Sequence, residues 1–301
     1  LADRSAVVVV QFNYAFFDFA ALRVFLRALL ESGRIVVVEL HATIDPAHDP
    51  SKKLAALVPE LAQCQRLLVH SVGDLNRLKA LGLVDNVTLF PHGVLDRLSI
   101  APKAGPEKII ASYGFFLPNK GLIELIEAFA ILRRDGFAGR LRMVNAEFPA
   151  PVSAALVAEA RQRIKALGLR GAIDLHTGFL SDADSLALLA PAQLVVYPYQ
   201  QTAESASGAV RYGLASELPV ATTPLSIFDD VSSVVFQLPG TSPEQMAQGI
   251  RDLLARLDRD DAEVRAVKAR AAAWRSAHLY SRLGRRMTGM LQALALDHKK
   301  R

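Results

Sequence analysis

The sequence predicts an α/β protein made of two doubly wound domains, each with a parallel sheet between layers of helices. Short β-branched runs alternate with helical patterns along the chain, and several predicted strands are apolar without interruption. Such strands are typical of parallel sheets that helices cover on both faces. A segment rich in Pro and Gly interrupts the alternation after residue 98. The 301 residues are enough for two domains of about 150 residues each.

The first hundred residues alternate four strands with three helices. The strands are predicted at 6–12, 34–41, 66–71 and 87–91, and the helices at 19–31, 51–62 and 73–81. Gly33 and Gly82 lie where two of these helices should end. Because the chain opens almost directly into a strand, we expect the first domain to be incomplete, with residues missing before Leu1.

A linker is predicted at 99–107, and the alternation resumes beyond it. The strands are predicted at 108–115, 140–145, 172–177, 193–198, 219–222 and 234–238. The helices are predicted at 120–135, 151–167, 182–190, 206–216 and 243–257. From Asp261 to His298 the chain is almost free of helix breakers, so we expect long terminal helices.

Composition excludes several classes of protein. With 51% hydrophobic and 22% charged residues the chain is compact rather than disordered, and no apolar run reaches the roughly 20 residues of a membrane span. Its only cysteine, Cys64, cannot form an internal disulfide, suits a reducing cytoplasm and is expected to be packed and inert.

The net charge of +5 comes largely from a basic carboxyl-terminal region that ends in Lys299, Lys300 and Arg301. A basic face attracts nucleic acid, anionic lipid or an anionic substrate. A solvated helix with an exposed tail explains the same charge. Nucleic-acid signatures are absent, so we expect no nucleic-acid partner, whereas peripheral membrane contact at the inner face of the membrane stays open.

The strongest candidate for chemistry is the segment 198–208, Pro-Tyr-Gln-Gln-Thr-Ala-Glu-Ser-Ala-Ser-Gly, which leads into the predicted helix 206–216. Small residues at a helix start leave main-chain N–H groups exposed to an anion. We therefore expect a phosphate site formed by Ser205, Ala206, Ser207 and Gly208. Glu204 would accept hydrogen bonds from sugar hydroxyls. Ordinary helix capping by one of the serines is the alternative.

The stretch from Gln193 to Pro224 resembles the donor-site segment of retaining GT-B glycosyltransferases of the group 1, or family 4, type. In that family a strand ending in Pro is followed by a Glu, seven residues, a second Glu and then Pro-Val. Glu204 falls on the first Glu, and the resemblance implies that it contacts the transferred sugar. The second Glu, which usually binds the ribose, is Tyr212 here, and Glu217 replaces a usual Gly.

The segment from Ser112 to Gly121 is similar to the strand and loop that open the donor domain of this family. Lys120 falls on the Lys that holds the donor diphosphate, and a cation there would stabilise the departing nucleotide. The family's Arg is Phe115 here, so one cation is missing. Gly114 is expected to allow close approach of the backbone to the diphosphate. On the nucleotide side of the site we expect Tyr212, Phe179 and Leu180.

The first half contains further matches. Residues 38–43 resemble the strand end at which the family places a His, so the resemblance implies that His41 holds the sugar or the acceptor through a ring N–H; a structural role is the alternative. Residues 70–75 resemble the next strand-to-helix turn of the family. Residues 90–94 resemble the signature that ends its first domain, which is a fold marker rather than a catalytic segment. His176, His278 and His298 are scattered, so no metal site is predicted.

The resemblance covers about residues 6–290 and implies a GT-B architecture, in which two Rossmann-like domains face a cleft. Residues 1–98 would belong to the acceptor-side domain and 108–273 to the donor domain, with 274–301 packing back on the first. The implied reaction moves a sugar, with retention, from a UDP- or GDP-sugar to a glycan or lipid-linked acceptor in bacterial glycan biosynthesis. It needs no cofactor and no metal.

Two other functions fit the same fold. The absence of the family Arg and of the second Glu favours a relative that binds a sugar nucleotide or a partner without turnover. A sugar-nucleotide epimerase would need carboxylates that face the sugar from both domains, and the sequence offers no convincing set.

Overall fold

The computed structural model describes residues 6–47, 49–96, 105, 107–202 and 204–298, which divide into two compact units. Unit 1 comprises Leu1–Gly93, Ala203–Ser207 and Tyr280–Arg301, and unit 2 comprises Val94–Thr202 and Gly208–Leu279. Most of the predicted linker 99–107 and the basic end 299–301 lie outside the described residues. None of the described helices combines the length and the apolar character that crossing a bilayer requires.

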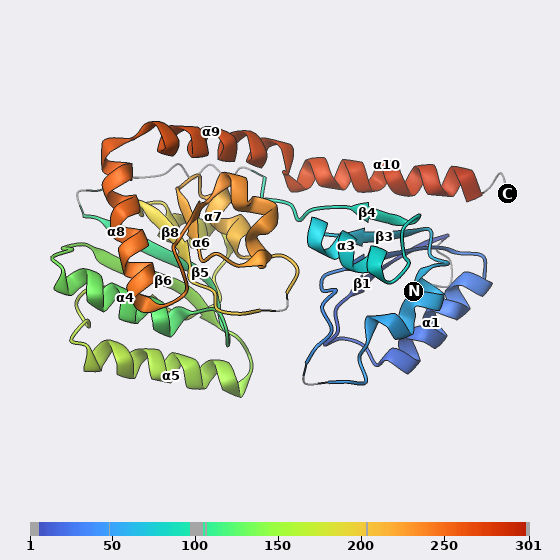
Figure 1. Ribbon diagram of the computed structural model, residues 1–301, viewed down its shortest axis with the longest axis horizontal. Coiled ribbons are helices and arrows are strands. Elements are labelled where there is room, and N and C mark those ends of the chain that lie inside the picture. Colours follow the sequence, from blue (N-terminus) through green and yellow to red (C-terminus); the bar gives the residue numbers. More distant parts are fainter. Residues whose placement is uncertain (1–5, 48, 97–104, 106, 203, 299–301) are drawn as a thin grey trace. The chain divides into compact units, whose positions relative to one another are not determined.

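Unit 1, in which Figure 1 labels β1, β3 and β4, is built on a four-stranded parallel sheet. The strand order is β1-β2-β3-β4. Its strands are β1 (Val7–Phe12), β2 (Ile35–Leu40), β3 (Arg66–Val69) and β4 (Val87–Leu89). Its helices are α1 (Phe19–Glu31), the 3₁₀ helix η2 (Leu54–Leu57), α2 (Val58–Leu61), α3 (Val72–Ala80) and α10 (Tyr280–His298).

Helices cover both faces of this sheet. Successive strand residues point to opposite sides, so strands that are apolar throughout place side chains to be buried on each face. One face packs against α1, whose apolar residues recur at helical spacing, namely Phe19, Leu22, Leu26 and Leu29. On the other face, Val37, Leu68 and Phe90 contact Leu283 of α10, the red helix of Figure 1. Cys64 is buried as expected, and burial together with the charge of Glu60 raises the pKa of its thiol to about 12.

The predicted helix 51–62 was wrong in its first turn. The backbone at Lys53 is extended, and the carboxylate of Asp45 accepts a hydrogen bond from the N–H of Leu54 at 2.9 Å. The helical segment therefore begins only at Leu54, as the short 3₁₀ helix η2 that continues into α2.

Unit 2 is built on a six-stranded parallel sheet with the strand order β10-β9-β8-β5-β6-β7. Its strands are β5 (Ile109–Phe116), β6 (Arg140–Glu147), β7 (Ile173–His176), β8 (Leu194–Tyr197), β9 (Val220–Thr222) and β10 (Phe236–Gln237). Its helices are α4 (Leu122–Arg134), α5 (Pro151–Ala166), α6 (Asp182–Leu189), α7 (Val210–Ala215), the 3₁₀ helix η3 (Ser226–Val234), α8 (Pro243–Arg259) and α9 (Ala262–Ala277).

This sheet is doubly wound. Helices α4, α5 and α8 contribute to the core on one face and α6, α7 and η3 to the core on the other, while α9 contributes residues to both. The predicted fold class, two parallel sheets each covered by helices, is confirmed. The sequence did not predict η3, and the predicted strand 234–238 is reduced to β10, since η3 occupies the chain up to Val234.

Gly121, which precedes α4, is a position that only glycine fits. It has a φ of +69°, and a Cβ there would lie 1.7 Å from the carbonyl oxygen of Pro198. An L-residue in this conformation costs about 1–2 kcal/mol, and the clash forces the backbone to move as well. We expect Gly121→Ala to lower the free energy of unfolding in urea by about 3 kcal/mol or more.

Gly82→Ala is the matched control for this prediction. Its φ is +82°, yet no described atom lies within 4 Å of the added Cβ. It should cost only about 1–2 kcal/mol. Equal losses for the two variants would contradict the role assigned to the close approach of Pro198.

Candidate functional site

The segment 204–208 was predicted to form the start of a helix, but in the structure it lies before the helix. Helix α7 begins at Val210 after Ala209, and no side chain caps it. The expectation that the N–H groups of residues 205–208 lie at a helix start was therefore wrong, as was helix capping by Ser205 or Ser207. Ser205 and Ser207 are buried, Ala206 is partly buried, and Glu204 and Gly208 are exposed.

Ser205 does not cap α7 because its hydroxyl binds another residue. Its hydroxyl donates a 2.6 Å hydrogen bond to Oδ1 of Asp74, at the start of α3. This contact attaches residues 204–207 to unit 1, although the chain on both sides belongs to unit 2.

Asp74 is the centre of a buried polar cluster in unit 1. The hydroxyls of Ser71, Thr43 and Ser205 donate to its carboxylate, each at 2.6 Å, and Arg77 donates at 2.7 Å. Burial alone would raise the pKa of Asp74, but these hydrogen bonds outweigh it and lower the pKa below its usual value. The carboxylate is thus ionised at neutral pH and holds three chain segments together.

Lys120 lies just before α4 in unit 2, as the resemblance implies. Its ammonium nitrogen is 4.1 Å from the ring centroid of Tyr199, a cation–π contact. The backbone is left-handed on either side of it, at Asn119 and Gly121. These turns hold the lysine at the carboxyl end of β5, the edge at which parallel α/β sheets bind ligands.

An exposed cavity of about 380 Å³ also lies beside the start of α4. Its charged lining residues are Glu124 and Glu159. Because two carboxylates repel a diphosphate, we do not assign the donor to this cavity.

Five aromatic residues lie along the same edge of the unit 2 sheet, and we call them the aromatic edge: Tyr113, Phe115, Phe148, Phe179 and Tyr212. Tyr113 and Tyr212 stack at 4.5 Å between centroids, and Phe115 contacts Phe148 at 5.3 Å and Phe179 at 6.0 Å. The side chain of Phe179 is 81% exposed. Phe115 and Phe179 stack on each other, whereas Phe148 meets Phe115 edge-on, and the ring of Phe179 is open to solvent.

The residues that replace family positions are part of this edge. Tyr212, where the family has a second Glu, donates a 2.8 Å hydrogen bond to Asp182, and burial raises the pKa of its hydroxyl. Phe115 replaces the family Arg. Gly114 beside it has a φ of +136°, which favours glycine, and Leu180 packs partly buried against the core of unit 2.

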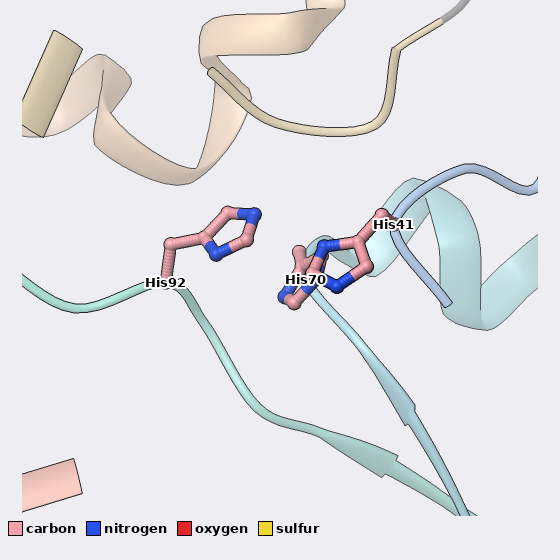
Figure 2. Close-up of side chains that lie close together, drawn as sticks. All are labelled: His41, His70 and His92. Carbon is pink, nitrogen blue, oxygen red and sulfur yellow. The ribbon is translucent and has the colours of Figure 1, made fainter. Parts of the chain in front are cut away.

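His41 lies at the carboxyl end of β2, next to two histidines with which the sequence analysis had not grouped it (Figure 2). Its Nε2 is 2.6 Å from Oε1 of Gln11, and its Nδ1 is 3.1 Å from Nε2 of His70. Burial and the neighbouring His70 lower its pKa, against the opposing effect of Glu39. Both ring nitrogens therefore already have protein neighbours.

The sequence contained a signal from which this histidine cluster could have been predicted. His41, His70 and His92 each follow a strand of one sheet, and the carboxyl ends of parallel strands meet at the same edge.

Solved structures share this architecture at low sequence identity. HepE from Anabaena in complex with UDP is 17% identical with a TM-score of 0.74, covering 95% of this chain and 78% of HepE. Sucrose-phosphate synthase from Thermosynechococcus elongatus is 14% identical with a TM-score of 0.74, covering 97% and 74%. A glycosyltransferase from Rickettsia africae is 14% identical with a TM-score of 0.73, covering 98% and 76%.

The chain has the GT-B fold. In fold it thus resembles the sugar-nucleotide glycosyltransferases with which the sequence motifs had been compared. No protein-family model matches the sequence, and no curated protein sequence matches it either.

Proposed function

We propose that this GT-B chain is a glycosyltransferase that moves a sugar from a nucleoside-diphosphate sugar to an acceptor hydroxyl, with retention at the anomeric carbon. The observation that carries the proposal is the position of Lys120, at the sheet edge of unit 2 beside a glycine that tolerates no side chain. UDP is present in the structure of HepE, whose fold is similar. A UDP-sugar is therefore the first donor to test, and a GDP-sugar the second.

Unit 2 is the proposed donor unit, and unit 1 the proposed acceptor-side unit. Lys120 holds the diphosphate by charge, while Glu204 and His41 contact the transferred sugar. To donate its Nε2 hydrogen to a sugar hydroxyl, His41 must release Gln11. The acceptor is a glycan or a lipid-linked sugar, and the reaction takes place in the cytoplasm, with peripheral membrane contact as a further proposal.

In the proposed step the bond between the anomeric carbon and the diphosphate oxygen breaks, and a bond to the acceptor oxygen forms on the same face. The acceptor proton passes to the departing diphosphate, so no side chain is needed as a strong base. Lys120 stabilises the negative charge that develops on that diphosphate. The step needs no cofactor.

The direct test is calorimetry of the purified chain with UDP, GDP and their sugars, followed by incubation with candidate acceptors. NMR of the product reports the anomeric configuration. Binding together with transfer that retains the configuration is the expected result. Inversion would exclude retention, binding with no turnover would favour a non-catalytic relative, and no binding of any nucleotide would overturn the proposal.

The aromatic edge is the proposed surface for the base. Stacking of a base on an aromatic ring is worth about 1–3 kcal/mol in single-stranded nucleic-acid complexes. We expect Phe179→Ala to weaken UDP binding by a factor of about 5–150 in calorimetry. Folding should be unaffected, since this ring is 81% exposed.

Phe16→Ala is the control for this variant, since Phe16 is 76% exposed and belongs to unit 1. It should leave UDP affinity unchanged. If Phe179→Ala behaves like this control, the base does not bind at the aromatic edge.

A further inference from the structure

Three histidines at one edge of the unit 1 sheet present ring nitrogens that all lie within 4.8 Å of one another (Figure 2). His41, His70 and His92 follow β2, β3 and β4, and the rings of His70 and His92 stack at 3.7 Å between centroids. His70 is buried, and the other two are partly exposed. The cluster is thus reachable from solvent and anchored from within the unit.

The hydrogen bonds around His41 fix which of its nitrogens carries the hydrogen. The amide nitrogen of Gln11 donates to Glu39 at 2.8 Å, so the amide oxygen is the atom that faces His41. An amide oxygen can only accept. Nε2 of His41 therefore donates, and in the neutral ring Nδ1 keeps a lone pair.

The tautomer of His70 is fixed in the same way. Its Nδ1 lies 2.9 Å from the carbonyl oxygen of Phe90, which can only accept. Nδ1 thus carries the hydrogen, and Nε2 of His70 keeps a lone pair. This lone pair faces that of His41 Nδ1 across 3.1 Å. Two lone pairs at this distance repel each other unless a proton or a metal ion lies between them.

A zinc-sized ion fits this arrangement. Zinc–histidine bonds are about 2.0–2.1 Å long, so one ion binding both nitrogens across 3.1 Å would make an angle of about 100°. His92 supplies a third nitrogen once its ring turns out of the stacked position on His70, because the ligand nitrogens of a tetrahedral zinc site lie about 3.4 Å apart. A carboxylate oxygen of Glu39 lies 3.9 Å from Nε2 of His70, which adds negative charge beside the ion.

The surroundings also match those of metal-binding histidines. Such residues usually donate their second ring N–H to a carbonyl or carboxylate, which fixes the ring and its tautomer. His41 does so to Gln11, which Glu39 orients in turn, and His70 does so to Phe90. We propose that His41, His70 and His92 form a binding site for a divalent transition metal ion of the zinc type.

This proposal departs from the sequence-based expectation of no metal. It does not depend on glycosyl transfer, because binding of the ion is its readout.

The test uses the full chain without a polyhistidine tag. Zn²⁺ alone is titrated by calorimetry, and Co²⁺ serves as a spectroscopic probe of the ligand set. We expect one ion per chain, with affinity reduced at least tenfold by His92→Ala. Gln11→Ala, which removes the supporting hydrogen bond to His41 together with the one to Glu39, should reduce affinity by about 10- to 100-fold.

His176→Ala, which changes a histidine of β7 in unit 2, is the control and should leave binding unchanged. Circular dichroism should give the same spectrum for each variant as for the unmodified chain. The proposal is overturned if the chain binds no stoichiometric Zn²⁺ and Co²⁺, or if His92→Ala and Gln11→Ala both bind as tightly as the unmodified chain.

Discussion

Replacing Lys120 with alanine should weaken the binding of UDP by a factor of about 10–150, because a hydrogen bond to a charged group contributes about 1.5–3 kcal/mol. The transfer rate should fall further, since the lysine is proposed to stabilise charge that grows as the nucleotide departs. Calorimetry measures the first effect and single-turnover kinetics the second. The proposal ties both effects to one ammonium group.

Two further variants make this result specific. Lys108→Ala removes an exposed lysine that pairs with Asp258 at the other end of β5, and should leave UDP affinity unchanged. Glu204→Ala should slow transfer with little effect on UDP affinity, because its proposed contact is with the sugar. If Lys120→Ala binds UDP as tightly as the unmodified chain, the diphosphate does not bind at Lys120.

Asp74→Asn should lower the free energy of unfolding by about 3–5 kcal/mol, because it neutralises a buried carboxylate and leaves its donors poorly matched. The pH dependence should change as well. The pKa of Asp74 is below 3.8 in the folded chain, so its contribution is present above about pH 4 and is lost as the pH falls further. Urea unfolding at pH 7 and pH 3 should show a smaller acid-induced loss in the variant.

Asp184→Asn is the matched control. Asp184 has the same relation to a capping serine, Ser181, but at an exposed position on α6. Its replacement should cost about 0.5 kcal/mol. An equally mild effect at Asp74 would show that the buried cluster contributes little to stability.

The alternation of strands and helices was predictable because each element carries its own local pattern. The continuous apolar strands and the helical spacing in α1 and α4 depend only on neighbouring residues. The same holds for single backbone positions. Glu217, where the family has a Gly, has a φ of +62°, which explains why a glycine is suited to that position.

Local patterns could not predict contacts between residues that lie far apart in the sequence. The hydrogen bond between Ser205 and Asp74 joins positions 131 apart, and it changes the role of the predicted phosphate segment. The histidine cluster was predictable in part. Each histidine was visible at a strand end, but their grouping required the strand order of the sheet, which the sequence analysis did not apply to them.

The position of α10 has a consequence for synthesis of the protein. The apolar face that contains Val37, Leu68 and Phe90 is made early, whereas Leu283, which covers it, is made after all of unit 2. At about 5–20 residues per second the ribosome needs roughly 10–40 seconds to reach this helix. During that interval the nascent chain exposes an apolar surface that favours aggregation. A chaperone that binds this surface should therefore raise the yield of native protein.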